Sequence, residues 1–135
     1  MGYVPAILDV NAETLSEPQV IEKIRRLKPR LLCFVVYGQN PNSGTVNMSG
    51  TVTLAQAIKD NGINTPIGAV GSHMSALPKE VLELEPSIDI VFCNEGVYAL
   101  RNILGTDLSK PNSYSNIRGL GFRLNGRAVL TEPEI

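Results

Sequence analysis

Residues that serve in many enzyme active sites are scarce in this sequence. It contains no tryptophan, two cysteines and one histidine, His73, and only 5% of its residues are aromatic. A single histidine with no cysteine beside it forms no nucleophile–base pair, and no group of His, Cys, Asp and Glu has zinc-ligand spacing. Phosphate-binding loops of the Gly-x-x-x-x-Gly-Lys-Ser/Thr and Gly-x-Gly-x-x-Gly types are also lacking. The sequence therefore predicts no catalytic residue and no metal ligand, and whether the chain is part of an enzyme stays open.

Strong net charge and long apolar runs are lacking as well. The formal net charge is −1 at pH 7, and no basic stripe with interleaved aromatic rings occurs, which argues against nucleic acid and anionic membranes as partners. No apolar run approaches the ~20 residues of a membrane span, and the start has no signal-peptide pattern. Cys33 and Cys93 lie in apolar runs, so we expect two buried thiols in a reducing compartment. These features predict one cytoplasmic domain over residues 1–135.

Apolar strand patterns and amphipathic helix patterns alternate along the chain. Ser16, Glu17 and Pro18 open a helix, because serine is a good N-cap and proline is tolerated in the first turn. The run from Leu31 to Tyr37 is apolar throughout, as in a strand covered on both faces of a parallel sheet. The strands that we expect lie at residues 3–8, 31–37, 66–70 and 88–93, and the helices at 16–28, 51–61, 78–84 and 97–104.

The C-terminal part of the chain has a different period. Leu120, Phe122 and Leu124 alternate with other residues, and Asn125-Gly126 is a strong hairpin signal. The fold class predicted is therefore α/β, with a doubly wound, flavodoxin- or Rossmann-like, mainly parallel sheet in three layers and a C-terminal β-hairpin.

Three loops that follow predicted strands carry glycines, hydroxyls and neutral amides. They span residues 38–45, 71–75 and 94–96. Because parallel strands end at the same edge of a sheet, the loops should gather on one rim, where ligands of such folds bind. Neutral polar groups without clustered Lys or Arg suit a large polar ligand and argue against a nucleotide polyphosphate. Turn chemistry alone would also explain the Gly and Ser residues, and stabilisation by the helix dipole explains Glu95 better than an acid–base role does.

Five segments of the chain resemble, in the same order, the cobalamin-binding domain of B12-dependent radical SAM proteins. The run Gly71–Leu82, Gly-Ser-His-Met-Ser-Ala-Leu-Pro-Lys-Glu-Val-Leu, is similar to the Gly-x-His-x-Ser-Ala-Leu-Pro-Glu-Glu-x-Leu segment of that family. The other four are Asp89–Gly96, Ile7–Glu13, Leu27–Leu31 (with Arg30 in place of the usual acid) and the hairpin Gly119–Gly126.

This resemblance implies a module that holds cobalamin base-off at the rim of the sheet, in methyl-transfer radical SAM chemistry. The Asp-x-His-x-x-Gly motif that supplies a cobalt-ligating histidine in methionine-synthase-like domains is absent, so the lower ligand of cobalt stays open. The cofactor-binding residues that the resemblance implies are Tyr37, Gly38, Gln39, Asn40, Ser43, Thr45, Gly71, Ser72, His73, Ser75, Asn94, Glu95 and Gly96.

Two parts of such proteins are missing from the sequence. The first strand and helix of the family lie before the position of Tyr3, so the chain is a piece, or places Tyr3–Leu8 differently, or receives the strand from a partner. No Cys-x-x-x-Cys-x-x-Cys cluster occurs, so an iron–sulfur cluster and S-adenosylmethionine would belong to a radical SAM catalytic domain outside this chain. The methyl acceptor and the oligomeric state, a homo-oligomer included, stay open.

Two alternatives bind no cobalamin. One is a cofactor-free, flavodoxin-like regulatory or protein-interaction domain. The other is a small flavin-binding electron carrier, which the scarcity of aromatic residues disfavours because few side chains could stack on an isoalloxazine ring.

Overall fold

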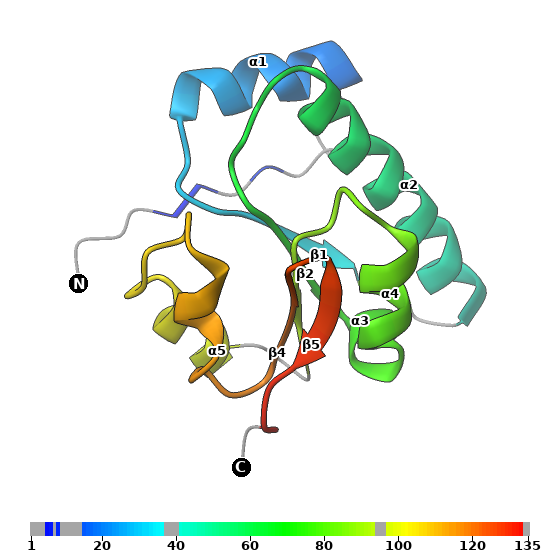
Figure 1. The fold of residues 1–135 in the computed structure, drawn as a ribbon. Helices are drawn as coiled ribbons and strands as arrows, with labels where there is room; N and C mark the ends of the chain where they lie inside the picture. Colours follow the sequence, from blue (N-terminus) through cyan, green and yellow to red (C-terminus); the bar gives the residue numbers. More distant parts are fainter. Residues whose placement is uncertain (1–4, 7, 9–14, 37–40, 94–96, 134–135) are drawn as a thin grey trace.

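The fold was obtained as a computed structural model, which describes residues 5–6, 8, 15–36, 41–93 and 97–133. At residues 41–49, 72, 73 and 97 the description covers the backbone only. The described strands form one sheet in the order β1-β2-β3-β4-β5 (Figure 1). They are β1 Leu32–Val36, β2 Ile67–Gly71, β3 Ile90–Phe92, β4 Leu120–Leu124 and β5 Arg127–Leu130.

The first helix begins and ends where the sequence predicts. Ser16 caps it: the Gln19 amide N–H donates to Ser16 Oγ at 3.4 Å, and the Ser16 N–H donates to Gln19 Oε1 at 2.8 Å. Such a capping box satisfies two backbone donors that the first turn leaves unpaired. The helices are α1 Glu17–Leu27, α2 Pro41–Asp60, α3 Ser72–Ala76, α4 Pro78–Leu84 and α5 Val97–Ile103, with a 3₁₀ turn, η1, at Pro111–Tyr114.

The sheet is mixed, and its parallel part comes first in the chain. β2 pairs in parallel with β1 and with β3, whereas β4 is antiparallel to both β3 and β5. The β4–β5 turn has φ 53° at Asn125 and 79° at Gly126, as a tight hairpin turn requires. The predicted α/β fold class with a C-terminal hairpin is therefore confirmed.

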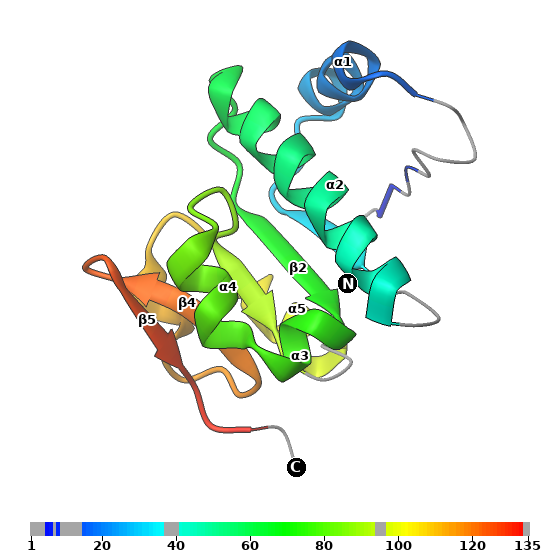
Figure 2. The same ribbon diagram turned by 90° about the vertical axis from the view of Figure 1, so that its right-hand side faces the viewer.

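Two apolar cores, one on each face of the sheet, give the three predicted layers. Ala69 and Val91 belong to the core shared with α1, α2, α3 and α4, and Ile90 and Phe92 belong to the core shared with α5 and η1. Figure 2 looks onto the first of these faces, with α2, α3 and α4 in front of the sheet. Residues within a strand alternate between the two cores, as the strand period of two requires.

Within the described residues, β1 is an edge of the sheet. The Leu32 N–H donates to the Pro66 carbonyl at 3.0 Å, so the backbone groups of Cys33 and Val35 point away from β2. Cys33 is exposed and Val35 is 65% exposed. The prediction of a strand covered on both faces is therefore wrong here, because α5 packs over β3 and leaves Val35 uncovered.

The two cysteines are also less buried than the sequence predicts. Cys93 is only half-buried, and the Cys33 residue is exposed at the sheet edge. Partial desolvation at the sheet edge nevertheless raises the pKa of the Cys33 thiol to about 11. The Cys33 thiol is thus protonated at neutral pH and a weak nucleophile there.

The start of the chain departs from the prediction as well. A strand was expected at Tyr3–Leu8, but the described residues Pro5, Ala6 and Leu8 lie in no strand. Leu8 packs instead against the core beneath α1 and α2. None of the described residues of this segment therefore pairs with β1 as a strand.

Candidate functional site

The rim predicted from the sequence is formed by the carboxyl ends of three parallel strands. Val36 at the end of β1 lies opposite Gly71 at the end of β2, and Val70 lies opposite Phe92 at the end of β3. The chain continues from these ends toward α2, α3 and α5. Segments far apart in the sequence therefore meet at one edge, as the fold class predicts.

Gly71 is the position in the rim where a side chain is excluded. Its φ is 155°, and a Cβ at this residue would lie 2.0 Å from the carbonyl oxygen of Val36. Real Cβ atoms do not come this close to a neighbouring backbone. The ends of β1 and β2 thus approach each other backbone to backbone, and glycine is the residue that permits this contact.

The segment after Gly71 is a short helix, where the sequence predicted a turn. Met74 in α3 is completely buried and packs into the core, whereas Ser75 and Ala76 are exposed. The helix stops at Leu77, which has φ −135° and ψ 54°, because the residue before a proline is disfavoured in the helical region. Met74 anchors α3 to the core, and Ser75 lies on its outer side.

The polar segment after β1 is also more helical than predicted. A loop was expected to precede a helix starting near Thr51, but α2 already begins at Pro41. Proline is favoured in the first helical turn, whereas the following Asn, Ser, Gly and Thr residues are weak helix formers that hide the helix in the sequence. Ser43 and Thr45 therefore lie in the first turns of α2.

The predicted site residues fall into three groups. Gly71 and Ser75 are described in full, and the backbone of Ser43, Thr45, Ser72 and His73 is placed in helices that begin at the rim. The others lie outside the described residues: Tyr37, Gly38, Gln39, Asn40, Asn94, Glu95 and Gly96. The structure thus brings the elements together, and the roles of the individual residues stay predictions.

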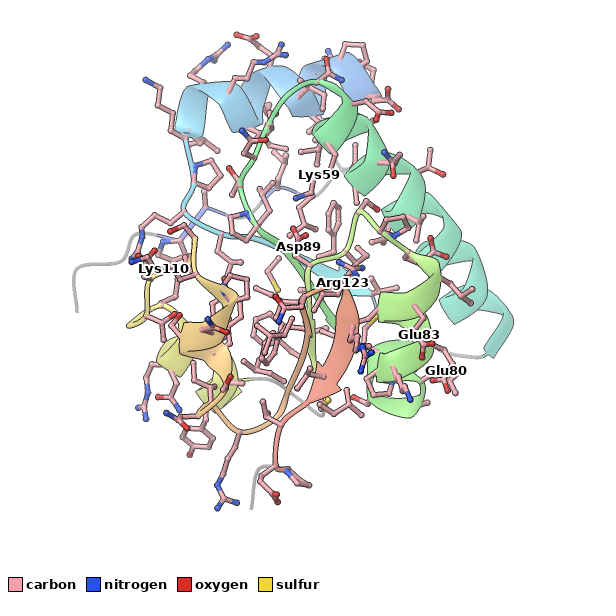
Figure 3. The ribbon with its side chains drawn as sticks, viewed as in Figure 1. Lys59, Glu80, Glu83, Asp89, Lys110 and Arg123 are labelled. Carbon is pink, nitrogen blue, oxygen red and sulfur yellow. The ribbon has the colours of Figure 1, made fainter. Side chains whose placement is uncertain are left out.

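A charged cluster at the opposite edge of the sheet was not predicted. Asp89, just before β3, accepts hydrogen bonds at Oδ2 from Lys59 Nζ at 2.7 Å and from the Ile67 N–H at 2.9 Å. Figure 3 shows Lys59 and Arg123 converging on Asp89, and Arg123 Nη1 lies 4.0 Å from Asp89 Oδ1. The sequence held two signals of this cluster. One is an acid before a buried strand, and the other is an arginine in the alternating β4 pattern.

Arg123 also connects the sheet to α4. Its Nε and Nη2 donate to the Leu82 carbonyl at 3.1 and 2.9 Å, and Nη2 donates to the Glu85 carbonyl at 2.8 Å. Carbonyls at a helix C-terminus lack intrahelical partners. One guanidinium therefore satisfies the end of α4 and faces the carboxylate of Asp89.

The part of the chain that the structure describes contains neither a metal-binding cluster nor a membrane-spanning helix. No group of three or more His, Cys, Asp or Glu residues there could hold a metal ion. None of the helices there is both long enough and apolar enough to cross a membrane.

Comparison with known proteins agrees with the fold. A family model described as the B12 binding domain matches residues 2–104, and the chain therefore belongs to this family. A curated relative, the cobalamin-dependent radical SAM methyltransferase TokK of Streptomyces tokunonensis, is 29% identical over 84 residues. The match covers 62% of this chain but only 12% of that relative. The resemblance stated from the sequence motifs is thus confirmed.

Proposed function

We propose that this chain is a cobalamin-binding module, which holds the corrinoid base-off at the rim formed by the ends of β1, β2 and β3. The observation that supports this most directly is the parallel alignment of these three strand ends, with Gly71 against the Val36 carbonyl. Ligands of open α/β sheets bind outside the carboxyl ends of the parallel strands, and the backbone contact at Gly71 holds two of these ends together. Membership in the B12 binding domain family supports cobalamin as that ligand.

The polar groups of the rim suit the outer part of a corrinoid. Cobalamin carries neutral amide side chains and a phosphodiester in its nucleotide tail. The first turn of the 20-residue helix α2 offers backbone N–H groups without intrahelical partners, which favour an anion. Ser75 is exposed on α3 beside this edge. In this proposal these groups bind and orient the cofactor, and the cofactor supplies the organometallic chemistry.

We also propose that the methyl-transfer chemistry resides in another domain. The relative is a radical SAM methyltransferase by name, and this chain spans 12% of its length. An iron–sulfur cluster and S-adenosylmethionine would then be bound by a catalytic domain that acts on the same cobalamin. A single domain over residues 1–135, a cytoplasmic location and a homo-oligomer stay predictions.

Bulky side chains on α3 should block the proposed site. We expect the double variant Ser72→Phe/Ser75→Phe to weaken hydroxocobalamin binding at least about tenfold, because two rings would occupy the edge where the corrinoid lies. Equilibrium dialysis measures the binding, and circular dichroism verifies that the fold is kept.

Ser115→Phe is the matched control for this test. Ser115 is also an exposed serine next to a short helical turn, η1, but it belongs to the segment that precedes the antiparallel strand β4 and does not follow a parallel strand. We expect it to bind cobalamin like the parent chain. Equal binding by the double variant and this control would remove α3 from the site.

A further inference from the structure

An open cavity of about 570 Å³ lies where β2 and β3 begin, at the edge of the sheet opposite to the rim. Its walls include the cluster of Lys59, Asp89 and Arg123, together with Arg30 and the apolar residues Pro66 and Leu108. Pro66 precedes β2 and Asp89 precedes β3. The cavity is therefore separate from the strand ends at which we place cobalamin, and a ligand could bind in it whether or not the rim binds cobalamin.

Two cationic side chains in this cavity have hydrogen-bond donors left over. Lys59 has three N–H donors on Nζ and uses two of them, one on Asp89 at 2.7 Å and one on the Thr65 carbonyl at 3.5 Å. Arg123 is held by its Nε and Nη2 contacts, and its Nη1 donors have no hydrogen-bond acceptor among the described residues. The side chains of Lys59 and Arg123 are 26% and 25% exposed. Both are thus fixed in position and open to the cavity.

The charge balance of the walls favours an anion. Arg30, Lys59 and Arg123 outnumber the two carboxylates, Asp89 and Asp107. Asp107 is already engaged, since the N–H and Oγ of Ser109 donate to it at 3.0 and 2.6 Å. The Tyr114 hydroxyl is engaged too, as a donor to the Leu108 carbonyl. Lys59 and Arg123 are therefore the cations beside Asp89 whose donors a ligand in the cavity could use.

We propose that this cavity binds a small organic molecule through an oxyanion, either a phosphate or a carboxylate. Lys59 Nζ and Arg123 Nη1 donate charge-assisted hydrogen bonds to the oxyanion. Pro66 and Leu108 contact the organic part. Asp89 holds the two cations in place and at the same time repels the anion, so its charge sets the affinity.

Titrations of the 135-residue chain with phenyl phosphate and with benzoate test this site. We expect saturable changes in the amide NMR signals of Asn64, Ile67 and Asp89 at constant ionic strength, with the signal of Ser75 at the rim unchanged. Response to one probe identifies the oxyanion, and response to both identifies a site for either. Response to neither, or shifts spread over the whole surface without saturation, overturns the proposal.

Three variants distinguish a binding site from a structural cluster. Lys59→Met should weaken binding about tenfold, because it removes a charged donor, whereas Lys79→Met, at an exposed lysine on α4, should change it less than about twofold. Asp89→Asn should tighten binding at least about threefold, because it removes the repelling charge. Equal affinities of the two lysine variants, or weaker binding by Asp89→Asn, would contradict the site.

Discussion

Alanine at position 71 is expected to lower the free energy of unfolding by about 3 kcal/mol or more. The added Cβ would lie 2.0 Å from the Val36 carbonyl oxygen and 2.8 Å from its carbonyl carbon. Both atoms belong to the backbone of the neighbouring parallel strand, which cannot move away without disturbing the β1–β2 ladder. Urea unfolding followed by circular dichroism measures the loss.

Gly50→Ala is the matched control, with an expected effect of opposite sign. Gly50 lies within α2, and a Cβ there would meet nothing within 4 Å. Glycine inside a helix costs about 0.5–1 kcal/mol relative to alanine, so this variant should gain stability by that amount. Equal stability of Gly71→Ala and the parent chain would show that β1 and β2 do not approach as described.

Replacing Arg123 by methionine should lower the free energy of unfolding by about 2–3 kcal/mol. The change removes the charged donors that bind the carbonyls of Leu82 and Glu85 at 2.8–3.1 Å. Hydrogen bonds to charged groups contribute about 1.5–3 kcal/mol each, and the partial exposure of this side chain reduces their sum. It also removes the Arg123 donors from the Leu82 carbonyl, whereas the Glu85 carbonyl still accepts from the Ile88 N–H at 3.1 Å.

Arg127→Met provides the comparison for this prediction. Arg127 is an exposed arginine in β5, the strand next to that of Arg123. An exposed substitution of this kind usually changes stability by no more than about 0.5 kcal/mol. Equal losses in the two variants, measured by urea unfolding, would contradict the role assigned to Arg123.

Local signals in the sequence account for the elements that were predicted correctly. Ser16 begins α1 through interactions with Gln19 three residues later, and Asn125-Gly126 sets the hairpin through the backbone angles of two residues. The exposure of Val35 depends instead on which helix covers β1, and the sequence of the strand itself does not predict that. The start of α2 was missed because its first turns have weak intrinsic helix propensity.

The two edges of the sheet also differ in how much of each the sequence predicts. Gly71 could be found from sequence, because a glycine that directly follows an apolar strand marks the strand end where ligands of this fold bind. For the cluster at the other edge the sequence offers single charged residues but not their pairing, since Lys59 and Asp89 are 30 residues apart and meet only in the folded chain. Chemistry that arises from tertiary contacts alone leaves no spacing motif to read.

Retention of cobalamin by the purified chain tests the central claim most directly. The chain is mixed with hydroxocobalamin or methylcobalamin, passed through a gel-filtration column, and its visible spectrum is recorded. We predict that corrinoid elutes with the protein and that its spectrum is that of the base-off form. A folded chain that elutes without corrinoid would contradict the proposal and favour a cofactor-free interaction domain of the same fold.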